Sequence, residues 1–304
     1  MKLLFIVNPI SGGVDKEPFL KEAVALCNNY RIDHKIFKTT GINDTEEVLK
    51  VIDLYKPDKI ASVGGDGTTL FTATVLLNKP YPMGIIPLGS ANGMATELFV
   101  DPSPIQALKD IIMSEMVEGL DILLINNEHY TLHIGDVGIN ASIVHSYEKD
   151  KNRGMATYAK YFIEELKQLK PFPITVKTKE STIKTKVLMS AICNSRKYGT
   201  GVPLNVVGNP MDGKFEIVLI ESVNLSSLLK AGLAAFDDKF YDNQTSQVLT
   251  TSKAELIFEE PRLLQLDGEV IGKFKNITVE LLAGAVNLIT TGRNKYIKKN
   301  VSTM

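Results

Sequence analysis

The chain has 304 residues, of which 44% are hydrophobic and 23% charged, and its formal net charge is −1. This is the composition of a globular protein, and it excludes a disordered chain. A net charge so close to zero argues against a nucleic-acid binder, which would carry a strong basic excess. No apolar run approaches the ~18 residues of a transmembrane segment. The length predicts two domains.

The cysteines and the N-terminus give an expectation about location. Cys27 and Cys193 lie in separate apolar runs, which predicts buried free thiols in a reducing compartment. The apolar run Leu3–Val7 ends at Asn8 and is shorter than the roughly 7–15 residues of a signal-peptide core. We therefore expect a cytoplasmic protein that would reach a lipid only from the membrane surface.

Residues 1–119 alternate short apolar runs with segments of helical period. The expected strands are 3–7, 34–37, 59–63 and 83–86, and the expected helices are 17–29, 44–55, 68–77 and 104–113. Within 17–29, for example, Leu20, Ala23 and Cys27 recur at three- and four-residue spacing. Asp44 is expected to cap the second helix. Strands and helices that alternate with short links predict an α/β domain with a mostly parallel sheet.

The pattern changes near Gly119. Short apolar runs follow, separated by turn residues, at 122–125, 130–134, 174–177, 187–193, 215–220, 255–258, 263–266 and 277–281. In 215–220 and 277–281 the apolar residues alternate, as in half-buried antiparallel strands. Two helical segments, 157–169 and 225–241, interrupt these strands. We expect a second, mainly β domain at 120–285, with 286–304 as a candidate for returning to the first domain.

Three loops of the first domain each follow a strand and precede a helix. They are Asn8–Gly13, Gly64–Thr68 and Pro87–Gly93. Such loops converge on the ligand crevice of an open α/β sheet. Their glycines allow close approach of the backbone, and N–H groups at a helix start attract phosphate. One such loop could be a tight turn, but three at one edge predict a polyphosphate nucleotide site. Asp66, flanked by glycines, is expected to act on a cation or a proton.

The order of these motifs resembles one family. The chain has no P-loop and none of the protein-kinase signatures. Its motifs are Asn8-Pro9-x-Ser11-Gly12-Gly13, Gly64-Gly65-Asp66-Gly67-Thr68, Gly89-Ser90-Ala91-Asn92 and Asp267-Gly268-Glu269. Over nearly the whole chain they resemble the diacylglycerol kinase catalytic family, which includes bacterial lipid kinases and the sphingosine and ceramide kinases. The resemblance implies a nucleotide domain like that of NAD kinases and phosphofructokinases, then an antiparallel β-sandwich domain, with ATP between them.

The same resemblance implies an activity and a set of site residues. The activity is that of an ATP-dependent lipid kinase, which transfers the γ-phosphoryl group to a hydroxyl of a diacylglycerol- or sphingoid-like lipid. Asp66 and Glu269 are the implied catalytic carboxylates, and we favour Asp66 as the general base, although the sequence does not rank the two. The implied nucleotide-site residues are Asn8, Gly12, Thr40, Gly64, Gly65, Gly67, Thr68, Gly89, Ser90, Asn92 and Asp267.

Two departures from the family pattern affect these expectations. The segment 209–216 matches one that binds a structural Mg²⁺ in some bacterial members, and here Asp212 and Glu216 are the candidate ligands. Met211 stands where the family has a first Asp, so one oxygen ligand of a cation that needs several is missing. Gly93 stands where the family commonly has Asp, which changes the expected hydrogen bonding near the acceptor. ATP and Mg²⁺ are the expected cofactors.

Two other functions stay open at this point. An NAD kinase-like enzyme shares the Gly-Gly-Asp-Gly loop and has an Asn-Glu pair, for which Asn127-Glu128 is a candidate. That pair, however, lies between two apolar runs and is typical of a hairpin turn. A non-catalytic regulator that binds nucleotide or lipid is the second alternative, and the retained Asp66 and Glu269 argue against it. The sequence does not specify which lipid is the acceptor. It also leaves the oligomeric state open, and a homodimer is one possibility.

Overall fold

The computed structural model describes residues 1–138, 170–197, 204–205, 207–222 and 246–297. The predicted helical segments 157–169 and 225–241 lie outside these residues. The chain divides into two compact units, a first unit of Met1–Leu120 with Gly284–Met304 and a second unit of Asp121–Ala283. In the described residues, no helix has both the length and the apolar character that a membrane span requires.

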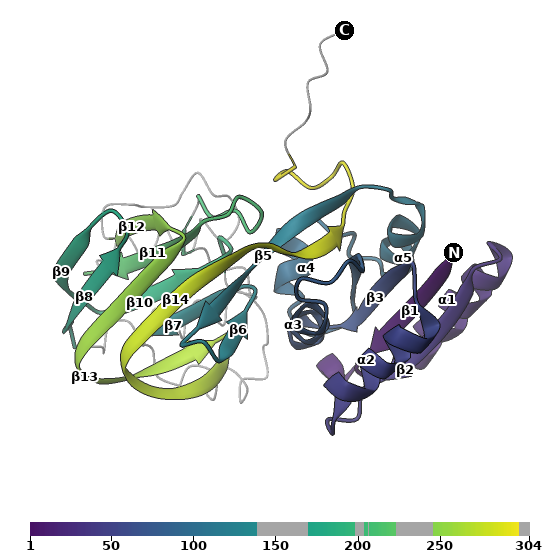
Figure 1. Ribbon diagram of the computed structural model, residues 1–304, viewed down its shortest axis with the longest axis horizontal. Helices are drawn as coiled ribbons and strands as arrows, with labels where there is room; N and C mark the ends of the chain where they lie inside the picture. The colour runs from purple at the N-terminus through teal and green to yellow at the C-terminus, as the bar shows by residue number, and fades with distance from the viewer. Residues whose placement is uncertain (139–169, 198–203, 206, 223–245, 298–304) are drawn as a thin grey trace, which may run out of the picture. The chain divides into compact units, whose positions relative to one another are not determined.

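The first unit alternates strands and helices, as the sequence predicted (Figure 1). In chain order its elements are β1 (Lys2–Val7), the 3-10 turn η1 (Ser11–Gly13), α1 (Glu17–Asn29), β2 (Asp33–Lys38), α2 (Asp44–Tyr55), β3 (Lys59–Gly64), α3 (Asp66–Val75), β4 (Met83–Pro87), α4 (Gly93–Glu97) and α5 (Pro104–Met113). The sequence missed α4, because a helix of five residues is too short to show a helical period. It also placed the start and the end of α3 two residues late.

The strands of the first unit form a parallel sheet in the order β2-β1-β3-β4. The end of β14 (Glu269–Ile289) joins it beside β4, where Leu288 pairs with Met83. The chain leaves β1 toward β2 on one side and returns to β3 on the other. The carboxyl ends of β1 and β3 therefore flank a topological switch point, which is where open α/β sheets bind ligands.

Helices cover both faces of this sheet. Leu3, Phe5 and Val7 point to one face and share a core with buried residues of α1 and α5. On the opposite face, α3 bonds to β3, since Ser62 Oγ donates to Thr68 O over 3.1 Å. Cys27 is buried in the first core, and burial raises the pKa of its thiol to about 11. Cys193 is also buried and free, so the prediction of buried thiols is confirmed.

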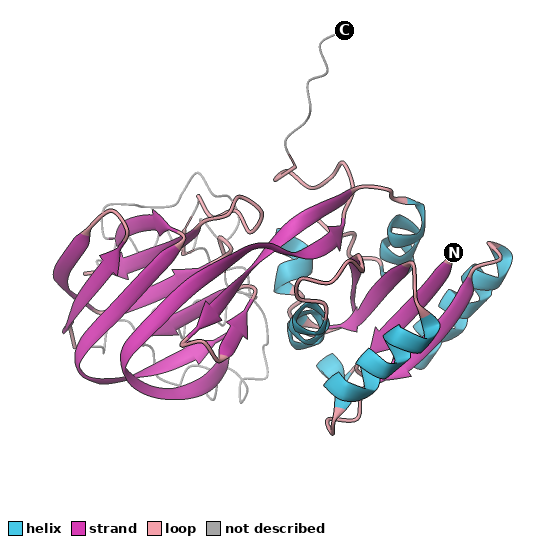
Figure 2. Ribbon diagram, viewed as in Figure 1, coloured by secondary structure: helices cyan, strands magenta, loops and turns pink. Residues whose placement is uncertain are grey.

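The described part of the second unit consists of strands and loops (Figure 2). With β5 entering from the first unit and β14 leaving toward it, the strands are β5 (Val117–Ile125), β6 (His129–Thr131), β7 (Ile134–Val137), β8 (Phe172–Thr178), β9 (Thr182–Val187), β10 (Met189–Cys193), β11 (Phe215–Ile220), β12 (Ser246–Thr251), β13 (Lys253–Leu266) and β14. Their pairs are antiparallel in the order β12-β11-β10-β7-β13-β14, and the β8–β9 hairpin pairs with β13. The predicted antiparallel β architecture is confirmed.

Several predicted strands of this unit had wrong limits. The run 187–193 is two strands, because the chain changes partners at Leu188 from β8 to β7 and β11. The run 130–134 likewise divides into β6 and β7. The runs 255–258 and 263–266 are one strand, β13, with a register shift between Ile257 and Arg262. These differences arise from strand pairing, which an apolar run does not encode.

The two alternating runs behave differently. In β14, Ile277, Val279 and Leu281 are buried in the core while Thr278 is exposed, so the half-buried pattern is confirmed there. In β11, however, every residue from Phe215 to Leu219 is buried, Glu216 included, so the half-buried prediction was wrong. Alternation of polar and apolar residues shows which face joins the core, but not whether the other face is covered.

The Asn-Glu pair considered for an NAD kinase-like enzyme lies in a tight turn. Asn126 and Asn127 have φ values of 51° and 57°, and Glu128 N donates to Ile125 O over 3.0 Å. Positive φ at consecutive residues is typical of the turns that join antiparallel strands. The turn joins β5 to β6, which confirms the predicted hairpin.

Candidate active site

The three glycine loops of the first unit lie against one another at the carboxyl ends of β1, β3 and β4. Asn8 N donates to Val63 O over 3.1 Å, and Leu88 N donates to Gly64 O over 2.8 Å. Ser11 Oγ lies 3.4 Å from Leu88 O, which joins the first loop to the third. The predicted convergence of the three loops is therefore present in the structure.

Glycine is required where the loop backbones touch. A Cβ atom on Gly89 would lie 2.3 Å from the Cα of Gly65, and one on Gly12 would lie 2.8 Å from the carbonyl carbon of Gly89. Gly12 also has a φ of +63°, in the left-handed region that favours glycine. Three backbones can meet this closely only without side chains, so these positions require glycine.

Asp66 is the first residue of α3 and is half-buried beside these loops. Its Oδ2 accepts a hydrogen bond from Gly93 N over 2.9 Å, and its Oδ1 accepts one from Met94 N over 2.9 Å. These two N–H groups begin α4, so the carboxylate is fixed in orientation by a helix start. Each oxygen of an ionised carboxylate can accept about two hydrogen bonds, so capacity remains for a ligand or a proton. Position 93, where the family commonly has Asp, contributes its backbone N–H here.

The third loop is closed by its own asparagine. Asn92 Oδ1 accepts from Gly89 N over 2.8 Å, and Asn92 Nδ2 donates to Gly89 O over 3.0 Å. Asn92 adopts a φ of 53°, which asparagine tolerates better than most residues. The Asn92 side-chain amide thus shapes the loop. Ser90, which lies between Gly89 and Asn92 in the chain, is exposed. Direct contact of Ser90 or Asn92 with a nucleotide stays a prediction.

A pocket of about 450 Å³ opens beside the first and second loops. Its lining residues are Asn8, Pro9, Ile10, Thr39, Thr40, Gly41, Asp44, Gly67, Thr68 and Phe71. They follow β1, β2 and β3, so the pocket lies at the topological switch point of the sheet. The volume falls within the roughly 300–1,000 Å³ of small-molecule sites. Four predicted nucleotide residues line it, namely Asn8, Thr40, Gly67 and Thr68.

Thr68 gives a structural test of whether this pocket fits a phosphate. Its side chain is 3% exposed, and its buried Oγ1 has no hydrogen-bond partner among the described residues. Buried hydroxyls are nearly always paired, so an unpaired one in a pocket wall fits a ligand acceptor such as a phosphate oxygen. Among the described residues that line the pocket, none is Lys or Arg. Hydroxyls and backbone N–H groups would therefore provide the contacts to an anion.

Sequence reasoning missed Lys16, which supports the first loop from within. Its Nζ donates to Ser11 O over 2.6 Å and to Val14 O over 2.7 Å, and the side chain is 3% exposed. Burial lowers the pKa of this ammonium, and the charge of Asp15 opposes the shift. A lysine is seldom buried without such partners. Only its position three residues after the glycines could have indicated this role.

Asp44 supports the pocket wall that follows β2. Its carboxylate accepts from Gly41 N over 2.7 Å and from Thr40 N over 2.9 Å. Burial tends to raise the pKa of Asp44, but these hydrogen bonds and one from the Thr40 hydroxyl outweigh it and lower the pKa. The prediction that Asp44 caps α2 was wrong, because the N-cap is Asn43. The Asp44 carboxylate instead points back to the loop before the helix and accepts hydrogen bonds from the N–H groups of Thr40 and Gly41.

Asp267 and Glu269 flank the tight turn between β13 and β14 in the second unit. Asp267 and Gly268 have φ values of 49° and 89°. Asp267 Oδ1 accepts from Thr131 Oγ1 over 2.7 Å and from Ile134 N over 3.1 Å. Glu269 is exposed at the start of β14. Asp267 thus fastens the turn to neighbouring strands. Asp66 and Glu269 belong to different units, and their meeting at one substrate stays a prediction.

The two candidate metal ligands in segment 209–216 differ in exposure and in their hydrogen-bond partners. Asp212 is exposed and accepts from Lys214 N over 3.0 Å. Glu216 is 2% exposed and accepts from Asn205 Nδ2 over 3.1 Å. Burial, with a contribution from Asp212, raises the pKa of Glu216 to about 7. In the part of the chain that the structure describes, no three acidic, His or Cys side chains gather to hold a metal. Binding of a cation by Asp212 and Glu216 stays a prediction.

Sequence reasoning also missed Asp121, which anchors this segment. Asp121 Oδ2 accepts from Gly213 N over 2.8 Å, and Asp121 N donates to Pro210 O over 2.9 Å. The side chain is 2% exposed. A lone Asp at the edge of an apolar run gave no indication of this contact, which joins residues 92 positions apart.

The fold consists of an α/β unit with a parallel sheet, which carries the candidate site, and an antiparallel β unit. Residues 2–125 match the diacylglycerol kinase catalytic domain, and residues 135–290 match the YegS C-terminal NAD kinase beta sandwich-like domain. The two matches together cover most of the chain, which therefore belongs to the family of proteins that combine a diacylglycerol kinase catalytic domain with a YegS C-terminal NAD kinase beta sandwich-like domain. The resemblance stated from the sequence motifs is confirmed.

Relatives and a solved structure agree with this assignment over most of the chain. A diacylglycerol kinase of Bacillus subtilis (strain 168) is 22% identical over 283 residues, which cover 91% of this chain and 92% of the relative. A diacylglycerol kinase of Mycobacterium tuberculosis (strain ATCC 25618 / H37Rv) is 23% identical over 235 residues, 75% of this chain and 76% of the relative. The crystal structure of a diacylglycerol kinase from Bacillus anthracis str. Sterne superposes with a TM-score of 0.72 at 21% identity, covering 96% of this chain and 98% of that one. At this identity the structural likeness shows the fold.

Proposed function

We propose that this protein is a lipid kinase, which transfers the γ-phosphoryl group of ATP to a hydroxyl group of a lipid. The observation that carries the proposal is the pocket at the switch point, which residues of the first two glycine loops help to line, together with the Asp66 carboxylate that the first turn of α4 holds in place. Family membership supports it, and the relatives from Bacillus subtilis and Mycobacterium tuberculosis are diacylglycerol kinases.

The nucleotide occupies the pocket of the first unit. Asn8, Thr40, Gly67 and Thr68 contact it, and the unpaired Thr68 hydroxyl donates to a phosphate oxygen. Six further residues of the predicted set belong to the three glycine loops, namely Gly12, Gly64, Gly65, Gly89, Ser90 and Asn92. Mg²⁺ bound together with the triphosphate would offset its charge, as in phosphoryl transfer generally. Asp212 and Glu216 are not needed for that role.

Asp66 accepts the proton of the lipid hydroxyl. As that oxygen bonds to the γ-phosphorus, the bond from the γ-phosphorus to the β,γ-bridging oxygen breaks, and ADP leaves. The two α4 N–H groups hold the carboxylate in place before the reaction, so little reorganisation is needed. A positioned general base contributes about 10²–10⁴-fold. Glu269 is the second carboxylate of the pair, and Asp267 fixes the turn that presents it.

The acceptor is a diacylglycerol- or sphingoid-like lipid. The protein meets this lipid at the membrane surface, as a peripheral protein. It acts as a monomer or a homodimer. The position of Asn127-Glu128 in the β5–β6 turn weighs against an NAD kinase-like enzyme. Membrane location follows from the acceptor, since such lipids reside in the bilayer.

A radiolabelled-ATP screen over a total lipid extract tests the proposal. The wild type should label one lipid class, and Asp66→Asn should label none. Parallel reactions with NAD in place of lipid test the NAD kinase-like alternative. Labelling of NAD but not of lipid, or ATP binding without turnover on any acceptor, would reject the lipid kinase function.

A further inference from the structure

The end of the chain returns to the first unit and contacts the last residue of α4. The Tyr296 hydroxyl donates a hydrogen bond to Glu97 Oε1. Glu97 ends α4 and is only 4% exposed, although it is a carboxylate. The Tyr296 ring also packs on the Phe99 ring, with centroids 5.8 Å apart and planes at 59°. Lys295, the residue before Tyr296, has its Nζ 5.0 Å from the centroid of the same Phe99 ring.

The C-terminal end of α4 has an unfavourable backbone conformation that these contacts stabilise. Phe99 has a φ of 58°. Val100 N donates to Ala95 O over 2.9 Å, and Phe99 N lies 3.2 Å from Thr96 O. This pattern is a Schellman-type helix end, whose left-handed residue is usually glycine. A bulky side chain in that conformation is strained by about 1–2 kcal/mol. The Phe99 ring is held by residues almost 200 positions later in the chain.

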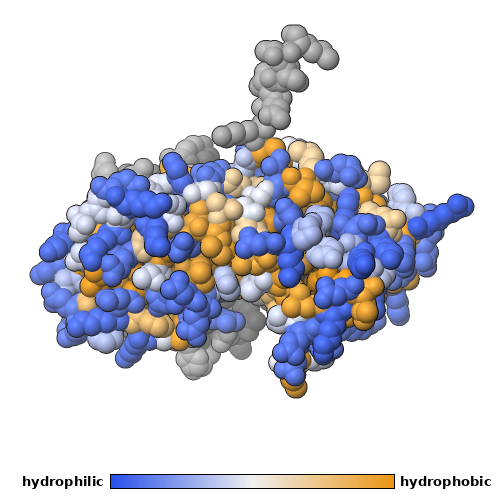
Figure 3. Space-filling view, in the orientation of Figure 1, coloured by the Kyte–Doolittle hydropathy of each residue, from blue (hydrophilic) through white to orange (hydrophobic). Residues whose placement is uncertain are grey.

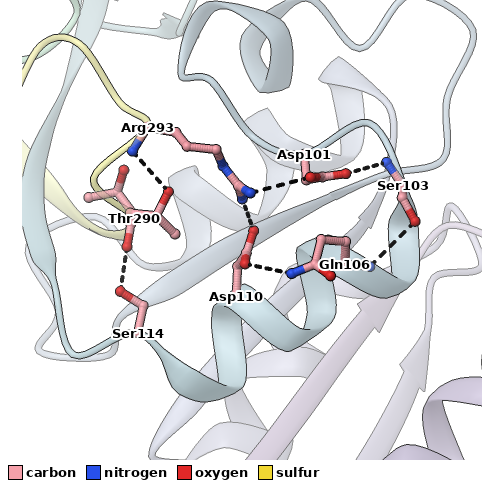
Figure 4. A network of polar contacts seen from close by, with 8 residues as sticks. Asp101, Ser103, Gln106, Asp110, Ser114, Thr290 and Arg293 are labelled. Atoms are coloured by element: carbon pink, nitrogen blue, oxygen red, sulfur yellow. Dashed lines mark hydrogen bonds and ion pairs between the residues drawn. The ribbon is translucent and has the colours of Figure 1, made fainter.

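Tyr296 is itself fixed by contacts that do not involve α4. Figure 4 shows Arg293 paired with Asp101 and Asp110, and Ser114 Oγ donating to Thr290 O. In addition, Asn294 is buried, and its Oδ1 accepts from Tyr296 N over 3.0 Å. The segment 290–296 is therefore anchored on α5 and on the loop before it, and it presents Tyr296 to α4 from a fixed position.

The other end of α4 holds Asp66. Gly93 N and Met94 N, which donate to the Asp66 carboxylate, and Glu97 are within one short helix of five residues. At 1.5 Å per residue the helix is only about 7 Å long, so a displacement of its last turn also displaces its first. Asp66 and Tyr296 thus bond to opposite ends of the same rigid element.

We propose that Tyr296 is a positioning residue for Asp66. Its hydrogen bond to Glu97 and its ring contact with Phe99 fix α4, and α4 in turn holds the Asp66 carboxylate in the orientation used for proton transfer. The catalytic consequence rests on the proposed function of Asp66, whereas the structural coupling does not. Tyr296 is not one of the residues that line the pocket.

Tyr296→Phe tests the coupling, because it removes only the hydroxyl and retains the ring. Amide hydrogen exchange of Gly93 and Met94 should become about tenfold faster in Tyr296→Phe, as it should in Asp66→Asn, since each loses a constraint on the same helix. Tyr30→Phe, at an exposed tyrosine of the same unit, is the matched control and should leave these two amides unchanged. Glu97→Gln keeps an acceptor oxygen for Tyr296 and should show a smaller increase than Tyr296→Phe.

Lipid phosphorylation by the same variants tests the catalytic consequence. The kcat of Tyr296→Phe should fall about tenfold, with the KM for ATP within about twofold of the wild-type value, because the pocket wall is intact. A general loss of folding would instead lower the amount of active enzyme, which the thermal midpoint relative to Tyr30→Phe detects. Unchanged exchange at Gly93 and Met94 would overturn the coupling, and faster exchange with unchanged kcat would overturn the positioning role. A wild type that phosphorylates no lipid would reject the proposed function, while the exchange result would still decide the coupling.

Discussion

The two units use acidic and polar side chains in different ways. In the first unit, three glycine loops meet at the edge of a parallel sheet, and Asp66 is held there beside a pocket of about 450 Å³. In the second unit, Asp267, Asp121 and Glu216 all bond to groups of the unit itself. The Asp66 carboxylate is thus held by the start of a helix at the edge of a sheet, whereas the other three carboxylates connect strands and turns of their unit. Substitutions in the glycine loops and at Asp66 should change the use of ATP, and those at Asp267, Asp121 and Glu216 should change stability.

Among substitutions that leave Asp66 in place, the largest effect is expected from Gly89→Ala. The new Cβ would lie 2.3 Å from the Gly65 Cα, a backbone atom, so the second and third loops must move apart. A misplacement of about 1 Å can cost on the order of 10²-fold in rate, so lipid phosphorylation should fall at least about hundredfold. Gly292→Ala is the control, because nothing lies within 4 Å of its Cβ position. Equal turnover by both variants would show that the loops do not need their close contact.

In the second unit, Glu216 should make stability depend on pH. Its pKa is raised from 4.5 to about 7, so between these values the folded protein keeps a proton that the unfolded chain has released. The free energy of unfolding therefore falls as pH rises through this window, by on the order of 3 kcal/mol, and levels off above it.

Glu216→Gln has no proton to lose and should lack that decline. Urea unfolding at pH 5 and pH 7.5 measures the difference, and Glu259→Gln, at an exposed residue of the same unit, should behave as the wild type. A decline of equal size in Glu216→Gln and the wild type would show that another group titrates.

Asp267→Ala should reduce stability more than ATP affinity. The variant removes the acceptor of the Thr131 hydroxyl and the Ile134 N–H and places alanine at a φ of 49°. A loss of about 2–3 kcal/mol in the free energy of unfolding follows. Asp212→Ala, at an exposed carboxylate, should stay within about 0.5 kcal/mol. If Asp267→Ala instead weakened ATP binding with stability unchanged, Asp267 would be a nucleotide ligand.

The smallest effect is expected at the pocket wall. Asp44→Asn weakens the hydrogen bonds that hold Thr40 and Gly41, because a neutral acceptor replaces a charged one. The dissociation constant of ATP should rise about threefold, a small change since the site is partly exposed. Asp53→Asn, at an exposed residue of the same helix, is the control in a calorimetric titration. Identical affinities would indicate a wall that keeps its shape without the carboxylate.

Much of the first unit could be predicted because the information is local. Helical period placed α1 and α5, apolar runs placed the strands, and the glycines placed the three loops. Parallel strands bring their carboxyl-end loops to one edge whatever the details of packing. On the face drawn in Figure 3, hydrophilic side chains cover much of the surface, with hydrophobic ones in smaller groups among them, as the composition indicated.

The contacts that complete the site could not be predicted, because they join residues far apart in the sequence. Asp66 bonds to Gly93, 27 positions away, and Tyr296 bonds to Glu97, 199 positions away. Neither pair leaves a periodic pattern. In the second unit, strand limits depended on partner changes, as at Leu188, and burial of Glu216 depended on cover over its face of the sheet.

The most direct measurement compares ATP binding and turnover in Asp66→Asn and the wild type. The pocket is lined by other residues, so the dissociation constant of ATP should stay within about threefold, while kcat with lipid acceptor should fall by about 10²–10⁴-fold. A variant that binds ATP equally and phosphorylates lipid at nearly the wild-type rate would contradict the role assigned to this carboxylate.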